Sequence, residues 1–190
     1  MQTGLAAHIQ KFVGLTNAES EILYESVKTL ELKKKELLLK EGQVCKANYF
    51  VEKGCLRLFF IDEKGAEQTS QFAIENWWLT DYGSFCSGAP SQFYIQSVEK
   101  SRVIVLEKSR QDDLFEKLPQ LDRYFRRILE KTYGAAQWRI KYIFSLSKED
   151  RYKHFMNSHP EFAQRVPQYM LASFLGLTPE YLSEIRKKKV

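Results

Sequence analysis

The sequence predicts an α+β fold: a small N-terminal β-roll with flanking helices, then one long helix, then a small C-terminal helical domain. Three observations predict it. Short strand-like runs recur at about ten-residue spacing between residues 32 and 108. Apolar residues recur at three- and four-residue steps over residues 119–145, and the final stretch indicates two short helices joined at a glycine. We therefore expect three parts, which are residues 1–118, 119–145 and 146–190.

Two helices are expected before the roll. Apolar residues at helical spacing run over residues 5–30 and are interrupted at the segment GLTNAES. Thr16 or Asn17 can cap the second helix, because a side-chain oxygen there accepts a hydrogen bond from the amides of the first turn. Glu19 and Glu21 then place negative charge where the helix dipole favours it.

The roll is expected from strands that are divided by turn residues. The runs YFVEKG and LRLFFI are predicted strands, and DEKG is a hairpin connection in which Gly65 takes a positive φ. A last strand pair is expected within residues 93–108. Trp77 and Trp78 are adjacent and costly to expose together, so we expect at least one in the core, with the other beside a pocket.

The long helix carries a narrow apolar seam. Its residues follow three- and four-residue steps: Phe125, Leu129, Thr132, Ala136, Ile140 and Ile143. One interpretation is a single helix that covers the roll of its own chain. The length of the helix and the narrowness of the seam favour a homodimer formed through residues 119–145.

Composition and charge narrow the class of protein. No apolar run approaches the roughly eighteen residues that span a bilayer, and the N-terminus lacks a signal-peptide layout. Three widely spaced cysteines suggest a reducing compartment, so we expect a cytoplasmic protein without a membrane segment. Residues 139–190 hold 10 Lys and Arg against 5 Asp and Glu, whereas residues 1–138 hold 19 of each. The positive charge is therefore concentrated in the last part, as expected when only that part meets a polyanion.

The last two helices have the pattern of a DNA-binding helix-turn-helix. Gly176 falls at the turn, Leu177 fills the gap between the helices, and Thr178 with Pro179 can start the second helix. The predicted DNA contacts lie on that second helix and are Thr178, Pro179, Glu180, Tyr181, Ser183, Glu184, Arg186, Lys187 and Lys188. The alternative is a helical hairpin in an ordinary bundle whose polar face is merely solvated.

Enzymatic function is not expected. The sequence holds no nucleophile with a neighbouring base in a recognisable motif, no Gly-rich phosphate loop and no metal-ligand spacing. We therefore predict no catalytic residue, no metal site and no cofactor.

The order of these parts resembles the Crp/Fnr family of bacterial transcription regulators. The segment EGQVCKANYFVEKGCLRLFFIDEKGAEQ is similar to the family's cyclic-nucleotide-binding, cupin-like β-roll, and LASFLGLTPEYLSEIRKK is similar to its DNA-recognition unit. The resemblance implies an effector domain over residues 1–118, a homodimer on a palindromic DNA site, and RNA polymerase as a further partner.

The same resemblance implies an effector pocket around TDYGSFCSGAPSQF. Its candidate residues are Trp77, Trp78, Asp81, Tyr82, Ser91 and Phe93. Members that bind cyclic AMP carry a glutamate and an arginine where Asp81 and Ser91 stand, and without the arginine a buried phosphate lacks its charge partner. Cyclic AMP is therefore not the expected ligand, and the effector stays open. No cysteine precedes Cys45 and the roll has no histidine, which disfavours iron–sulfur or haem sensing.

The predicted function is that of a homodimeric DNA-binding transcription regulator that reads a palindromic site with residues 178–188. Pro179 and Glu184 stand where cyclic-AMP-type members place arginines, so the DNA sequence read is expected to differ. The hairpin wing that usually follows the recognition helix is expected to be absent. The alternative is a ligand-binding or protein-interaction module whose helix-turn-helix has lost specific DNA binding.

Overall fold

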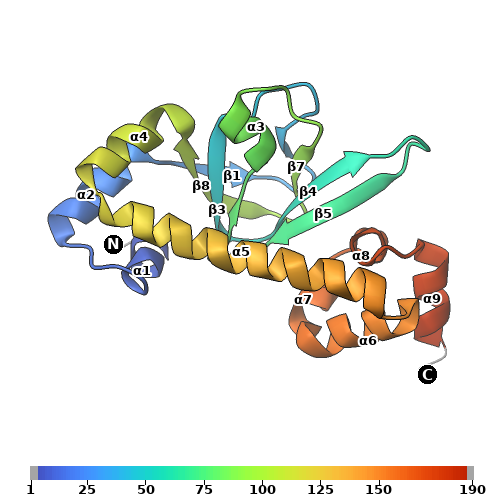
Figure 1. Ribbon diagram of the computed structural model, residues 1–190. Coiled ribbons are helices and arrows are strands. Elements are labelled where there is room, and N and C mark those ends of the chain that lie inside the picture. Colours follow the sequence, from blue (N-terminus) through green and yellow to red (C-terminus); the bar gives the residue numbers. More distant parts are fainter. Residues whose placement is uncertain (1–3, 188–190) are drawn as a thin grey trace. The chain divides into compact units, whose positions relative to one another are not determined.

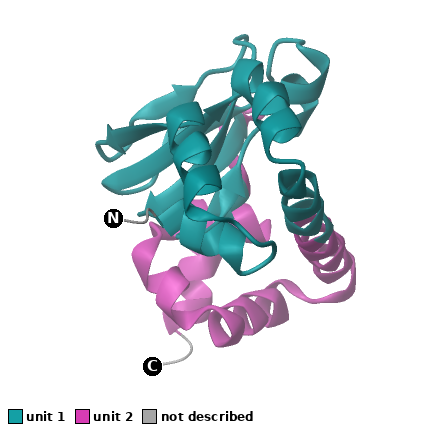
Figure 2. Cartoon of the chain, turned by 90° about the vertical axis from the view of Figure 1, so that its left-hand side faces the viewer, with its two compact units in different colours: residues 1–60, 71–130 teal, residues 61–70, 131–190 magenta. Residues whose placement is uncertain are grey.

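A computed structural model describes residues 4–187, and residues 1–3 and 188–190, including the predicted DNA contact Lys188, lie outside the described residues. The chain forms two compact units, coloured separately in Figure 2. The first comprises residues 1–60 and 71–130, and the second comprises residues 61–70 and 131–190. The second unit thus includes the tip of a hairpin from the β-rich part of the chain, a division that the sequence does not predict.

The elements follow the predicted order of strands between helices (Figure 1). The helices are α1 (Gly4–Gln10), α2 (Asn17–Ser26), α3 (Tyr82–Ser87), α4 (Lys108–Lys117), α5 (Gln120–Ser145), α6 (Lys148–Ser158), α7 (Pro160–Arg165), α8 (Gln168–Leu175) and α9 (Pro179–Lys187). The strands are β1 (Lys28–Leu32), β2 (Leu37–Leu39), β3 (Ala47–Lys53), β4 (Leu56–Ile61), β5 (Glu67–Ala73), β6 (Trp78–Leu79), β7 (Tyr94–Ser97) and β8 (Ser101–Glu107). The α+β class and the long helix are confirmed, whereas α7 was not predicted.

The strands form two four-stranded sheets. Their orders are β1-β8-β3-β6 and β2-β7-β4-β5, so strands distant in sequence pair side by side. Gly65 has the predicted positive φ, +77°, in the β4–β5 connection, and Gly54 also has a positive φ, +101°, before β4. At Gly54 a Cβ atom would lie 2.7 Å from the Cα of Ser101, so only glycine fits.

The roll interior is filled by one face of each strand. Alternate residues such as Val103 and Val105 of β8 point inward, as the two-residue period of a strand requires. The buried cluster comprises Leu32, Leu39, Cys45, Ala47, Tyr49, Val51, Leu56, Leu58, Ala73, Leu79, Phe85, Ile95, Val103 and Val105. The opposite face of the first sheet packs on helices, which gives the first unit a second core.

That second core joins α1, α2, α4 and the first turns of α5 to the sheet. Thr16, one of the two predicted caps, starts α2, and Glu19 completes a capping box in which both reciprocal hydrogen bonds are present. The buried members are Leu5, Ala6, Ile9, Val13, Leu23, Phe50, Trp78, Ile104, Leu106, Leu114, Leu118, Leu121, Tyr124 and Phe125. Phe125, which the sequence assigns to the intermolecular seam, therefore packs within its own chain.

A buried hydroxyl lies at the centre of this core. Trp78 Nε1 donates to Tyr124 Oη at 2.8 Å, and His8 Nδ1 lies 2.9 Å from the same oxygen. Because the indole can only donate, Tyr124 accepts from Trp78 and retains its own proton for a second hydrogen bond. Burial raises the pKa of the Tyr124 phenol well above its ordinary value, so the hydroxyl stays protonated. Tyr124 thus fixes α5 to α1 and β6.

The second unit has its own small core. It comprises Tyr152, Leu171, Ala172, Leu175, Leu177, Leu182 and Ile185, contributed by α6, α8, α9 and the turn between the last two helices. Ser147 caps α6, since its hydroxyl accepts from the amide of Asp150. The close packing of α8 on α9 uses Ala172, whose side chain is fully buried.

We expect Tyr124→Phe to destabilise the chain by about 1–3 kcal/mol, because the indole N–H of Trp78 then loses its buried acceptor. The free energy of unfolding from urea titration, at one fixed protein concentration, measures this. Tyr169→Phe is the matched control, since Tyr169 is an exposed tyrosine of α8 that lies outside this core. Equal stabilities of the two variants would contradict the role given to the Tyr124 hydroxyl.

Candidate nucleic-acid interface

The turn between α8 and α9 is built by local backbone chemistry. Gly176 adopts φ +67°, and its amide donates to the carbonyls of Ala172 and Ser173. The amide of Leu177 donates to Ala172 O at 2.9 Å, which closes the six-residue ring of a Schellman ending. Leu177 is buried in the core of the second unit. The glycine and the leucine therefore act as the sequence predicts.

The start of α9 is also as expected from its residues. Pro179 is the first helical residue, and Thr178 Oγ1 accepts a hydrogen bond from the amide of Tyr181 at 3.2 Å. Leu182 and Ile185 are buried beneath the helix. These contacts hold α9 against α8 and leave its opposite side uncovered.

The uncovered side of α9 is polar and charged. Glu180, Ser183, Glu184 and Lys187 are all exposed, and their spacing of three and four residues places them on one helical face. Arg186 is exposed beside this face. The helix therefore presents carboxylate and hydroxyl acceptors near its start and cations in its last turn.

Two predicted contacts differ from the rest of this face. Tyr181 is only partly exposed and packs against the core of the second unit. The ammonium of Lys148 lies 5.4 Å from the centre of its ring, within the range of a cation–π contact. Thr178 is exposed, but its hydroxyl already accepts from a backbone amide. Both residues therefore support the shape of α9 as well as its surface.

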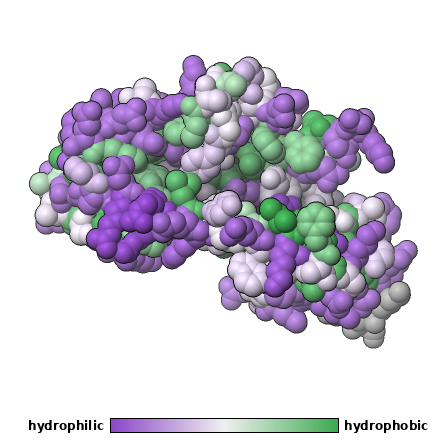
Figure 3. All heavy atoms as spheres, viewed as in Figure 1, coloured by the Kyte–Doolittle hydropathy of each residue, from purple (hydrophilic) through white to green (hydrophobic). Residues whose placement is uncertain are grey.

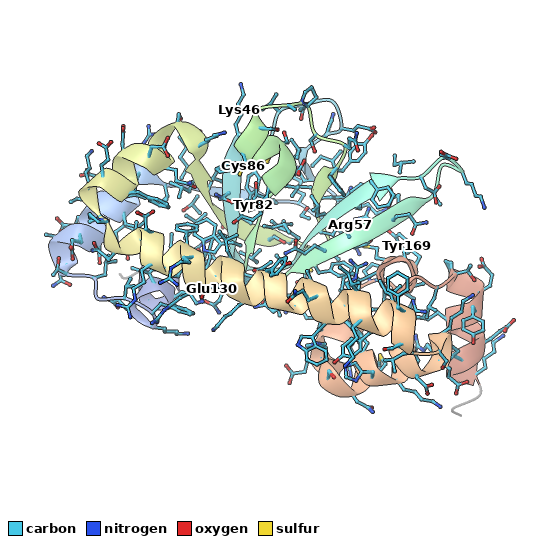
Figure 4. All side chains as sticks on the ribbon, in the orientation of Figure 1. Lys46, Arg57, Tyr82, Cys86, Glu130 and Tyr169 are labelled. Carbon is cyan, nitrogen blue, oxygen red and sulfur yellow. The ribbon has the colours of Figure 1, made fainter. Side chains whose placement is uncertain are left out.

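The structure adds one candidate that the sequence analysis missed. Tyr169 lies in the first turn of α8 and is 43% exposed (Figure 4). Tyrosine hydroxyls and helix N-termini are common donors to DNA phosphates. Within the pattern of α8, Met170 and Leu171 define the buried side. An aromatic residue just outside that side was the available signal.

The predicted effector-pocket residues are not brought together as one set. Trp78 is buried in the helix-facing core, whereas Trp77 is 51% exposed. Tyr82, labelled in Figure 4, lies in the first turn of α3 and is exposed. Phe93 packs against the roll interior. The expectation that at least one of the two tryptophans packs in the core is therefore confirmed by Trp78.

Asp81 and Ser91 are directly bonded to each other. Ser91 Oγ donates to Asp81 Oδ2 at 2.6 Å, and both side chains are buried. Asp81 also caps α3, because its Oδ1 accepts from the amides of Gly83 at 3.0 Å and Ser84 at 3.4 Å. Ser91 Oγ in turn accepts from the amide of Phe93 at 2.9 Å. The carboxylate therefore has partners on both oxygens.

The chain is similar to known proteins in its sequence. Residues 29–117 match the cyclic nucleotide-binding domain family. The chain is 27% identical over 188 residues to the transcriptional activator protein Anr of Pseudomonas aeruginosa, covering 91% of this chain and 75% of Anr. It is 27% identical over 165 residues to the fumarate and nitrate reduction regulatory protein of Escherichia coli, covering 81% of this chain and 65% of that protein. The chain is thus similar, over most of its length, to transcription regulators of the Crp/Fnr type.

A solved structure gives the same fold. FixK2 from Bradyrhizobium japonicum superposes with a TM-score of 0.73 at 15% identity, over 85% of this chain and 83% of that one. The Crp/Fnr relatives are transcription regulators, which supports the prediction that this chain is not an enzyme. No described residues form a group of three or more histidines, cysteines and carboxylates placed to hold a metal ion. Over residues 4–187, no helix is both long and apolar enough to cross a membrane.

Proposed function

We propose that this chain is a homodimeric transcription regulator of the Crp/Fnr type that reads a palindromic DNA site with α9. The observation that supports this proposal is the exposed polar face of α9, which follows directly on the helix-turn-helix turn at Gly176. Glu180 can accept from the exocyclic amine of cytosine, and Ser183 can bond several bases. Arg186 and Lys187 supply charge for phosphates. Two copies of α9 would then occupy half-sites about one helical turn of DNA apart.

The dimer is supported by the apolar face of α5. Leu129, Ala136 and Ile143 recur at seven-residue spacing, and Tyr133 and Ile140 repeat the same interval four residues later. This is the heptad pattern of a two-helix seam. Ile140 is 56% exposed and Phe144 is 86% exposed. In contrast, hydrophilic residues cover most of the side of the molecule that Figure 3 shows. A second copy of α5 would remove this face from water.

We further propose that the roll does not take a cyclic nucleotide. Asp81 places a buried negative charge on the α3 amides, and Ser91 offers no cation. A cyclic phosphate entering there would meet a carboxylate that already has its hydrogen-bond partners. The effector of the chain, if it has one, is then of another chemical class.

We expect the DNA affinity of Lys187→Ala to depend less on salt than that of the unchanged chain. Each lost phosphate contact reduces the slope of log affinity against log salt by about 0.9, hence by about 2 for a dimer. Mobility-shift titrations on a site selected from random DNA, at several salt concentrations, measure the slope. Lys117→Ala, at an exposed lysine of α4, is the control and should leave it unchanged.

Failure to select any preferred DNA sequence would overturn the proposal. In that case the exposed Glu184, which repels phosphate, would favour an interaction module that has lost specific DNA binding.

We expect Ile140→Glu to raise the dimer dissociation constant by at least about 100-fold, because two carboxylates would face each other in an apolar seam. Sedimentation velocity over a range of protein concentrations measures this. Ala135→Glu introduces the same side chain on the opposite side of α5, at an exposed position, and should leave the dimer intact. If the unchanged chain remained a monomer at all of these concentrations, the proposed dimer seam would be refuted.

We expect no saturable binding of cyclic AMP to the unchanged chain in equilibrium dialysis. The combined change Asp81→Ala and Ser91→Arg removes the competing carboxylate and supplies a guanidinium, and should raise the affinity about tenfold or more. Asp81→Ala alone is the control. Micromolar binding by the unchanged chain would contradict the proposal.

A further inference from the structure

A partly buried arginine of α5 lies at the helix-turn-helix without belonging to its core. Arg139 is partly buried, and this burial lowers the pKa of its guanidinium from the ordinary value. Its Nη2 donates to the carbonyl of Phe174 at 3.0 Å, and its guanidinium carbon lies 4.5 Å from the centre of the Phe174 ring. Phe174 is in the last turn of α8. One side of the guanidinium therefore contacts the end of the first helix of the motif.

The carbonyls at that end have a complete set of partners. Ala172 O and Ser173 O accept from amides of the turn. Phe174 O accepts from Arg139, and Leu175 O accepts from Arg151 Nη1 of α6 at 2.8 Å. The last four carbonyls of a helix have no partner within it, so each needs one from outside. Two are supplied locally, and two are supplied by arginines from other helices.

The other side of Arg139 holds the hairpin tip that belongs to the same unit. Its Nη1 donates to Ser70 O at 2.8 Å, and its Nη2 lies 3.4 Å from Thr69 O. In addition, the amide of Thr69 donates to Ser173 Oγ of α8 at 2.7 Å. Three backbone groups of β5 are thus satisfied by α5 and α8. The chain segments involved are more than sixty residues apart in sequence.

The geometry suits arginine rather than lysine. A guanidinium presents several donors in fixed directions and stacks on an aromatic ring, whereas an ammonium is a single compact group. Only the planar group can reach Ser70 O and Phe174 O together while lying over the Phe174 ring. The position therefore does more than neutralise charge.

We propose that Arg139 is a positioning residue for DNA recognition. It fixes the turn between α8 and α9 by holding Phe174 O, and it makes that turn dependent on the hairpin tip by holding Thr69 O and Ser70 O. The part of this proposal that concerns DNA rests on the proposed function. The clamp, by which we mean the hydrogen bonds from Arg139 to Phe174 O, Thr69 O and Ser70 O, does not rest on that function.

Hydrogen exchange of the DNA-free protein tests the clamp. Arg139→Gln should raise deuterium uptake in peptides that cover residues 61–70 and 168–177, because both segments lose the same partner. Ser173→Ala, which removes only the acceptor of the Thr69 amide, should raise uptake in the hairpin peptide. Arg123→Gln, at an exposed arginine of α5, should change neither. Unchanged uptake of residues 94–107 shows that the roll stays folded.

Fluorescence anisotropy on the selected DNA site tests the positioning role. We expect Arg139→Gln to weaken binding about tenfold, Arg139→Lys to restore only part of this, and Arg123→Gln to bind as the unchanged chain does. Unchanged uptake in the hairpin peptide of Arg139→Gln would overturn the clamp. Increased uptake with unchanged DNA affinity would overturn the positioning role. If the unchanged chain selects no DNA site, the proposed function fails, the DNA role of Arg139 fails with it, and the exchange data still decide whether the clamp exists.

Discussion

The hydrogen bonds of the Tyr124 hydroxyl are the interaction on which the helical side of the first unit depends. They connect α1, β6 and α5 through buried side chains. A buried polar group of this kind specifies one arrangement, since any shift of α5 leaves the Trp78 indole without an acceptor. The same helix carries the exposed apolar face and Arg139 further along its length. Anchoring one end of α5 therefore leaves the rest of it available for a partner.

The second unit depends on a different constraint, which is the need to satisfy the end of α8. A helix of eight residues has few internal hydrogen bonds, so its stability comes from contacts outside it. Two of its last four carbonyls accept hydrogen bonds from amides of the turn, and the other two accept hydrogen bonds from Arg139 and Arg151. Because both arginines come from other helices, the shape of the recognition motif is not a property of the motif alone.

Much of the fold follows from local signals in the sequence. Gly65, Gly176 and the Thr16 cap mark turns and helix starts by chemistry that acts within a few residues, and each lies at a position that the sequence predicts. The clamp could not be predicted, because Arg139 bonds to backbone carbonyls about seventy residues earlier, and a carbonyl leaves no trace in residue identity. Phe125 was assigned to the seam for a related reason. Helical spacing shows that it shares a face with Leu129, but not that the chain's own core ends between them.

Asp81 and Ser91 have to be considered together, because each affects what the other contributes to phosphate binding. A serine in place of an arginine would by itself leave a pocket that lacks a cation. The structure shows that this serine donates to Asp81, whose other oxygen accepts from the first amides of α3. An incoming phosphate would have to displace the carboxylate and leave its charge buried without partners, which costs several kcal/mol. If the roll takes no cyclic nucleotide, as we propose, the serine at position 91 and the capping by Asp81 act in the same direction, and Ser91→Arg alone would produce an internal ion pair with Asp81 rather than a phosphate site.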